Sequence, residues 1–154
     1  MNNRKQRISA GVMVVRENSI LMVNHKVEGR HDFWVPPGGG VQGIETLEAA
    51  ALRELEEEAG VSTGKLTLAY IEELYTPKHR ECKFWFFTDQ YTGTLQTEKN
   101  SAERESIVDV AFISRDRLSQ LIVFPSVVPE QLWKDIKTGF SSPLYLGIHE
   151  MLFP

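Results

Sequence analysis

The sequence has little cysteine, no long apolar run and no excess of positive charge. Its 154 residues include one cysteine, Cys82, which cannot form an internal disulfide, and this is typical of a protein from a reducing compartment. No apolar stretch is long enough to span a bilayer, and the first residues do not resemble a secretion signal. We therefore expect a cytoplasmic protein that does not contact a membrane.

The charge and composition of the chain argue against further classes of protein. The net charge is −4, so no basic field is available to recruit a polyanion, which argues against a nucleic-acid or membrane-surface protein. The apolar share of 42% and the charged share of 25% are ordinary for a globular protein. Because no internal repeat, low-complexity segment or linker interrupts the chain, residues 1–154 are predicted to form a single domain.

What the sequence does contain is a glycine loop that leads into a helix dense in carboxylates. Gly38, Gly39, Gly40 and Gly43 allow the loop backbone to adopt positive φ and to approach a ligand closely. From about residue 45 to residue 59 the chain lacks glycine and proline and consists mainly of good helix formers, and Gly60 then ends the helix. The sequence therefore predicts a loop joined to a helix that carries the acidic side chains.

Three of these acids share one face of the helix. Glu54, Glu57 and Glu58 stand at i, i+3 and i+4, along the edge of the apolar stripe rather than opposite it. That stripe recurs in steps of four and consists of Leu47, Ala51, Leu55 and Ala59. An acidic run is most often a solvated face, but like charges at this spacing destabilise a helix, and acids near its C-terminal end oppose the helix dipole. A site for a hard divalent cation needs clustered oxygens, so we interpret the three acids as metal-binding.

The same residues resemble the Nudix box. The pattern Gly39-x5-Glu45-x7-Arg53-Glu54-Leu55-x-Glu57-Glu58-x-Gly60-Val61 matches each fixed position of that family's signature. Residues 34–39 also resemble the segment that precedes the box, except that Pro36 stands where an aliphatic residue is more usual. The resemblance implies an α/β fold, an α/β/α sandwich with a mixed β-sheet. The alternation of predicted strands and helices suggests the same arrangement.

The resemblance also implies a metal-dependent reaction. The ligands of Mg²⁺ or Mn²⁺ would be Glu54, Glu57, Glu58 and the main-chain carbonyl of Gly39. Arg53 would orient neighbouring carboxylates such as Glu45. Clustered carboxylates repel phosphate unless cations lie between them, and such ions neutralise a diphosphate and activate water. We therefore expect water to attack one phosphorus of a P–O–P linkage.

The general base stays open between two places in the chain. The family implies either a carboxylate of the helix, such as Glu54 or Glu57, or one from a loop farther along. In this sequence the loop candidates are Glu103 and Glu105, in the polar segment that precedes Ile107.

Three functions remain open, and they differ in the substrate or in whether one is hydrolysed. Pro77 stands sixteen positions after Val61, a spacing that in the family tends to mark ADP-ribose or ADP-sugar pyrophosphatases, and this favours an ADP-ribose-like nucleoside diphosphate derivative. The alternatives are a (d)NTP pyrophosphohydrolase of the MutT type and a catalytically silent Nudix domain that binds a nucleotide and regulates a partner. Candidate contacts to a small-molecule nucleotide are Arg30, Trp34, Pro77 and Arg80. The family also makes a homodimer an open expectation.

Elsewhere the pattern predicts a hairpin, further strands and two helices. Apolar runs at 8–16 and 20–24 around a polar turn predict the hairpin, and the run at 83–91, aromatic on both faces, predicts a central strand. Strands are also expected at 33–35, 66–74 and 107–113, helices at 115–121 and 129–137, and a docking tail at the C-terminal end.

Overall fold

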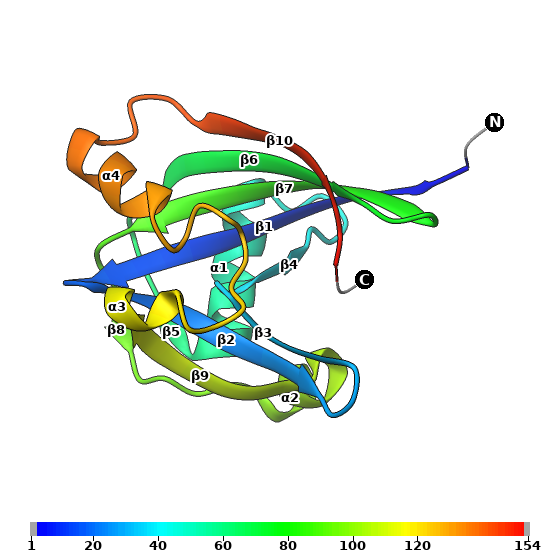
Figure 1. Cartoon of the computed structure of the whole chain (residues 1–154), viewed down its shortest axis with the longest axis horizontal. Coiled ribbons are helices and arrows are strands. Elements are labelled where there is room, and N and C mark those ends of the chain that lie inside the picture. The colour runs from blue at the N-terminus through cyan, green and yellow to red at the C-terminus, as the bar shows by residue number, and fades with distance from the viewer. Residues whose placement is uncertain (1–2, 153–154) are drawn as a thin grey trace.

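The structure is a computed structural model that describes residues 3–152, in which a mixed sheet carries helices on both faces (Figure 1). This confirms the predicted α/β/α sandwich. In chain order the elements are β1 Lys5–Arg16, β2 Ser19–Val27, β3 His31–Val35, β4 Gly38–Gly40, α1 Leu47–Ala59, β5 Val61–Ser62, β6 Thr67–Tyr75, β7 His79–Thr88, β8 Thr92–Gly93, α2 Lys99–Glu105, β9 Ile107–Ser114, α3 Arg115–Leu118, α4 Gln131–Thr138 and β10 Leu144–Glu150.

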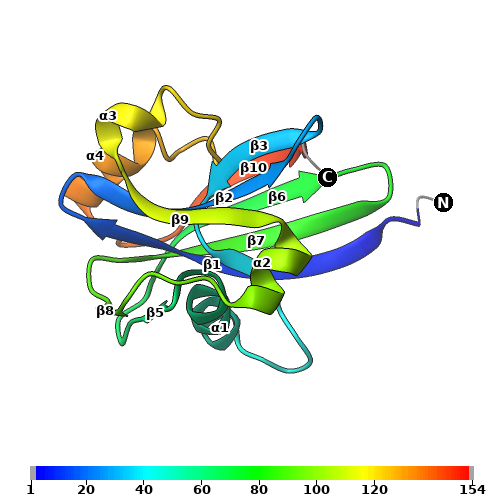
Figure 2. The ribbon, with the colours of Figure 1, turned by 90° about the horizontal axis from the view of Figure 1, so that it is seen from below.

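The sheet opens into a wedge at the β1–β2 hairpin. Within residues 3–152 the strand order is β10-β6-β7-β1-β2-β3, with β4 also paired to β1 and β9 also paired to β2. β1 and β2 pair only beside their turn, at Val15 with Ile20 and Arg16 with Ser19. Beyond the turn β1 continues along β7 and β2 continues along β9, so that the two halves diverge (Figure 2). We call them the β1 half (β1, β4, β6, β7 and β10) and the β2 half (β2, β3 and β9).

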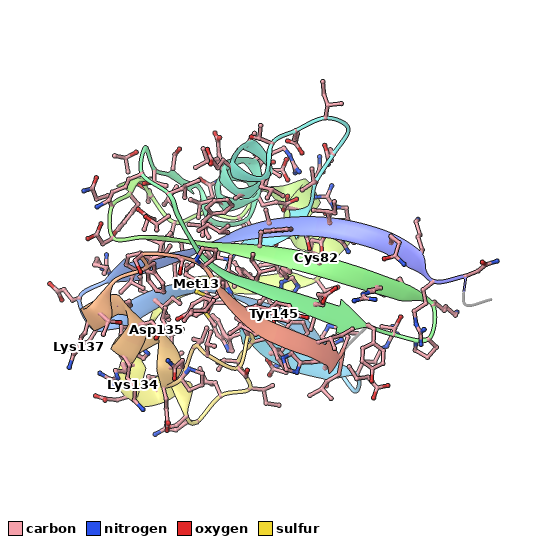
Figure 3. All side chains as sticks on the ribbon, turned by 90° about the horizontal axis from the view of Figure 1, so that it is seen from above. Met13, Cys82, Lys134, Asp135, Lys137 and Tyr145 are labelled. Atoms are coloured by element: carbon pink, nitrogen blue, oxygen red, sulfur yellow. The ribbon has the colours of Figure 1, made fainter. Side chains whose placement is uncertain are left out.

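Two apolar clusters hold the halves in place. One lies under α1 and joins it to β1 and β7 through residues such as Ala51, Leu55, Val12 and Phe86. The other fills the closed end of the wedge beneath α3 and α4, and it contains Met13, Tyr70, Trp85 and Trp133 (Met13 is labelled in Figure 3). Because β1 and β7 send alternate residues into the two clusters, both strands are covered on both faces where they cross the core, whereas the first four residues of β1 are exposed. This confirms the prediction of a central strand at 83–91, since β7 lies between β6 and β1.

One close approach in the core requires a glycine. A side-chain carbon at Gly11 would lie 2.4 Å from the Trp85 ring and 2.6 Å from the Pro37 carbonyl oxygen. The Val12 N–H donates to that same carbonyl at 2.9 Å, which fastens the segment before β4 to β1. The lack of a side chain at Gly11 therefore allows β4, which consists of three glycines, and the segment before it to lie beside the buried Trp85.

Two segments differ from the prediction. The polar segment expected to be a loop contains α2, and the C-terminal segment expected to be a docking tail contains β10, which pairs in parallel with β6. α2 has no apolar stripe, because Ser101 is its one buried residue, so hydrophobic periodicity does not mark it. β10 joins a strand about seventy residues away, as in the pairing of Leu144 with Tyr70, and no local pattern encodes such a register.

No helix within residues 3–152 is both long and apolar enough to cross a membrane.

Candidate active site

Helix α1 places two of the predicted metal ligands on its buried side. It begins after Thr46, whose Oγ1 accepts a hydrogen bond from the Ala49 N–H at 3.0 Å, and it ends at Gly60, which has a φ of 73°. Glu54 and Glu58 are 7% and 1% exposed, so both carboxylates are turned towards the protein. A buried charged carboxylate destabilises the folded protein unless a partner compensates its charge, so the burial of these two acids is better explained by a function than by a contribution to stability.

Glu58 is the more deeply buried of the two acids. Its Oε1 accepts a hydrogen bond from the Gly38 N–H at 2.7 Å, and no lysine, arginine or histidine within residues 3–152 forms an ion pair with it. Burial raises the pKa of Glu58 to about 8, and the nearby charges of Glu54 and Glu105 act in the same direction. The Gly38 hydrogen bond and the charge of Lys83 favour the charged carboxylate, but burial outweighs both, and an added cation would stabilise the charged form further.

Glu54 lies directly against the glycine strand. A side-chain carbon at Gly39 would lie 2.6 Å from Glu54 Cδ, so the carboxylate occupies the space that any other residue would fill. Burial raises the pKa of Glu54, and its hydrogen bond with Arg53 opposes that shift. The glycine at position 39 therefore allows α1 carboxylate oxygens to lie next to the β4 backbone.

Arg53 connects the acids to one another. Its guanidinium donates to Glu45 at 2.8 and 3.0 Å, to Glu54 at 2.9 Å, to Glu57 at 3.4 Å and to the Gly40 carbonyl at 3.0 Å. The expected pairing of Arg53 with Glu45 is thus present, and the Arg53 hydrogen bond lowers the pKa of Glu45. Arg53 fixes the loop, β4 and α1 relative to one another.

The donor atoms suit a hard divalent cation in kind. They are carboxylate oxygens and glycine carbonyls, which Mg²⁺ takes in preference to nitrogen or sulfur. Within residues 3–152, no three acidic, histidine or cysteine side chains converge closely enough to enclose an ion as they stand. Glu54 and Glu57 instead share Arg53.

A cavity of about 640 Å³ lies between the two halves of the wedge and reaches this edge at Gly38 and Gly39. Residues of the β1 half form one wall, and His25, Phe33 and Phe124 stand on the other side. Glu54 and Glu58 are not among the residues that line it, because they approach β4 from the α1 side. The metal candidates and the cavity thus meet at the two glycines.

Of the two later acids considered as general base, the structure brings one to the cavity. Glu105 lines it, whereas Glu103, an exposed residue of α2, does not. The His25 ring nitrogen Nδ1 lies 2.8 Å from the Glu105 carbonyl oxygen, and the Lys26 N–H donates to Ser106 O at 3.0 Å, so α2 is tied to β2. The charge of Glu105 acts on both Glu54 and Glu58.

The predicted substrate contacts lie outside the cavity lining. Arg30 is exposed in the β2–β3 turn, Pro77 is exposed in the β6–β7 turn, and Arg80 forms an ion pair with Glu73 at 2.6 Å. Trp34 packs against the core at the closed end of the wedge. The lining contains charged residues that sequence reasoning missed, chiefly Glu72, Glu81 and Lys83. Lys83 carried a signal, as a charged residue in the run 83–91 expected to be covered on both faces, whereas Glu72 lay in the strand expected at 66–74 and Glu81 lay before the run 83–91.

Replacing Gly39 by alanine is expected to lower turnover by roughly 100-fold, because a displacement of about 1 Å at a reacting group has that order of effect. The added carbon would displace the Glu54 carboxylate, which Arg53 and burial hold in place. Gly64→Ala is the matched control, since nothing lies within 4 Å of an added carbon there. Steady-state rates of both variants check this, and equal rates would show that the Gly39–Glu54 contact has no part in the reaction.

The chain is similar to several known proteins. The family described as NUDIX domain matches residues 5–131. An 8-oxo-dGTP diphosphatase of Proteus vulgaris is 31% identical over 103 residues, covering 66% of this chain and 91% of that protein. An RNA pyrophosphohydrolase of Zymomonas mobilis is 26% identical over 147 residues, covering 94% of this chain and 93% of that protein. A MutT NUDIX hydrolase structure from Burkholderia pseudomallei has a TM-score of 0.71 at 23% identity, covers 84% of this chain and 99% of its own, and supports the fold alone.

Proposed function

The chain belongs to the NUDIX family and is a hydrolase of pyrophosphate bonds, and we propose that it acts on nucleoside 5′-triphosphates with release of pyrophosphate. The observation that carries this proposal is the meeting of the buried Glu54 and Glu58 carboxylates with a nucleotide-sized cavity at Gly38 and Gly39. The names of two relatives, an 8-oxo-dGTP diphosphatase and an RNA pyrophosphohydrolase, support a triphosphate over an ADP-ribose-like substrate. The prediction of ADP-ribose depended on Pro77, which lies outside the cavity lining.

Four groups would hold a divalent cation, Mg²⁺ or Mn²⁺. They are the carboxylates of Glu54, Glu57 and Glu58 and the main-chain carbonyl of Gly39. Glu54 and Glu58 contact the β4 segment directly, and Glu57 is linked to Glu54 through Arg53. Such a cation neutralises the charge on the diphosphate and makes water more acidic. The burial of Glu58 without a basic partner supports this role, because an added positive charge compensates the acid.

The protein's own groups would position the reactants. Arg53 keeps Glu45, Glu54 and Glu57 in one arrangement through its five hydrogen bonds. Glu105 is the proposed general base, since it lines the cavity and Glu103, the other candidate before Ile107, does not. The walls of the wedge exclude bulk water from the nucleoside, while the phosphates lie at the β4 edge beside the acids.

Product release from a panel of nucleotides tests the proposal. With Mg²⁺ present, dGTP, ATP and CTP are expected to yield nucleoside monophosphate and pyrophosphate, and a chelator is expected to abolish the reaction. Turnover of ADP-ribose alone would contradict the triphosphate proposal and favour the ADP-ribose-like substrate. No product from any nucleotide, with nucleotide binding retained, would favour a silent regulatory domain. Cytoplasmic location and a homodimer stay predictions.

A further inference from the structure

The wall of the cavity formed by β6 and β7, which we call the floor, carries charged side chains, although buried sheet surfaces are usually apolar. Antiparallel pairing of β6 with β7 places Glu72 opposite Lys83, and Glu81 and Trp85 stand on the same face of β7 at alternate positions. Glu72 is 5% exposed and Glu81 is 4% exposed, yet both line the cavity. Acids are almost never so deeply buried without a partner, so this floor needs a chemical explanation.

Each carboxylate has one oxygen fixed by the protein. Glu72 Oε1 accepts a hydrogen bond from the Trp85 indole N–H at 2.9 Å, and Glu81 Oε1 accepts a short one from the Ser9 hydroxyl. No group within residues 3–152 donates a hydrogen bond to the second oxygen of either acid. The two second oxygens are therefore acceptors available to a molecule in the cavity.

Lys83 completes the floor as a donor. Its ammonium lies 4.5 Å from the centre of the Trp85 ring, and within residues 3–152 no carboxylate or carbonyl accepts a hydrogen bond from it. Burial alone would raise the pKa of Glu81, but the positive charge of Lys83, the Ser9 hydrogen bond and the charge of Arg7 outweigh burial and lower it. The Glu81 carboxylate therefore stays charged beside a lysine that has no acceptor of its own.

These groups determine which end of a nucleotide lies on the floor. Carboxylates repel phosphate unless a cation lies between them, and the proposed cation ligands are at the β4 edge, so the phosphates would lie at that edge and the base over Glu72 and Glu81. On the other side of the cavity the Phe33 and Phe124 rings meet edge to face with centroids 5.6 Å apart, a wall that suits a planar ring. The second carboxylate oxygens require N–H donors, and Lys83 requires an acceptor. An exocyclic amino group next to a ring nitrogen or carbonyl supplies both.

We propose that Glu72 and Glu81 read the base, and that the enzyme selects nucleotides whose base carries an exocyclic amino group over otherwise similar nucleotides whose base lacks it. Guanine, adenine and cytosine have this group, whereas hypoxanthine and uracil do not. A base without it leaves a buried carboxylate oxygen unpaired, which costs the binding energy of that contact. The inference rests on the proposed nucleotide hydrolysis and adds the identity of the residues that discriminate between bases.

Matched nucleotide pairs test the proposal without any variant. The kcat/KM for GTP is expected to exceed that for ITP by roughly 10- to 100-fold, and CTP is expected to exceed UTP by a similar factor. The phosphates are the same within each pair, so their contacts cancel in the ratio. GTP and ITP differ only in the 2-amino group, whereas in UTP a carbonyl replaces the 4-amino group of CTP and N3 becomes an N–H donor, so the GTP and ITP pair is the more direct test. Ratios near one in both pairs would overturn the proposal.

Glu72→Gln makes the test sharper because the Trp85 indole N–H holds one oxygen in place. The amide oxygen takes over that hydrogen bond, and the amide NH₂ then faces the cavity, so an acceptor becomes a donor. The variant is expected to lose the preference for GTP over ITP, and Glu81→Gln is a second, independent variant of the same kind. Equal losses of kcat/KM for GTP and ITP would mean that the acids act on the cavity only through their charge, which would contradict base reading.

Glu73→Gln is the matched control, one position along the same strand. Glu73 lies outside the cavity lining, where it accepts hydrogen bonds from Arg80 and Tyr145, so its substitution should leave the GTP to ITP ratio unchanged (Tyr145 is labelled in Figure 3). Dissociation constants for GTP and ITP give the same ratio independently of turnover. A protein that binds GTP more tightly than ITP but hydrolyses neither would contradict the proposed function and keep the base reading.

Discussion

Glu58→Gln is expected to lower metal-dependent turnover by about 1,000-fold or more, because loss of charge stabilisation by a bound cation is worth several kcal/mol in the transition state. The carboxylate is 1% exposed and has no basic partner within residues 3–152. Glutamine keeps the size and can still accept the Gly38 hydrogen bond, so the variant removes the charge and little else. Single-turnover and steady-state rates at saturating Mg²⁺ measure the effect.

The same variant is expected to be at least as stable as the original protein when metal is removed. An acid held at 1% exposure destabilises the fold unless it is neutralised, and glutamine removes that cost. Thermal unfolding in the presence of a chelator checks the stability. The control is Glu56→Gln, because Glu56 is an exposed glutamate of the same helix, and it should change neither the turnover nor the thermal stability. Full turnover of Glu58→Gln would show that the metal site is assigned to the wrong residues.

Arg53→Lys is expected to lose both activity and stability, although the charge is conserved. The guanidinium makes five hydrogen bonds to three glutamates and the Gly40 carbonyl, and one ammonium cannot replace that geometry. The Arg53 side chain is 21% exposed, so its ion pairs are only partly screened by solvent. We expect a fall of about 2 to 4 kcal/mol in the free energy of unfolding and of roughly 100-fold in kcat.

Urea unfolding and steady-state kinetics check both effects. Arg117→Lys is the control, because Arg117 is exposed on α3 and none of the side-chain hydrogen bonds within residues 3–152 involves it. A variant that unfolds at the same urea concentration and retains kcat would show that Arg53 is an ordinary surface ion pair. A loss of stability with unchanged kcat would instead show that Arg53 stabilises the fold but does not position the acids for the reaction.

Local sequence patterns were sufficient for the elements that they encode directly. The helix from Leu47 to Ala59, its end at Gly60, the β1–β2 hairpin and the central position of β7 all agree with prediction. In each case the information lies within a few neighbouring residues, as a helical period, a capping residue, a short turn or an aromatic run. The grouping of Glu54, Glu57 and Glu58 on one side of α1 is of the same kind.

The tertiary structure decided which of those acids are buried. A helical period places Glu54 and Glu58 at the edge of the apolar stripe, but only the packing of α1 against β4 turns them inwards, where Gly39 leaves room for one and Gly38 donates to the other. Likewise, α2 brings Glu105 to the cavity, while Glu103 on the same short helix does not line it, although both side chains are exposed. The spacing of residues along a helix fixes the direction in which each side chain points around the helix axis, but only the neighbouring strand determines what that side chain contacts.

By itself the sequence determined the reaction class, since the spacing of one glycine, one arginine and several glutamates is readable without any fold. The structure alone decided where a nucleotide can lie. The cavity exists because β1 and β2 separate beyond their turn, and its floor joins Glu72, Glu81 and Lys83 from two strands. Glu72 and Lys83 face each other across the β6–β7 hairpin, but the Ser9 hydroxyl that binds Glu81 comes from β1, 72 residues away. The pairing of β1 with β7 joins distant parts of the chain, and no local sequence pattern encodes its register.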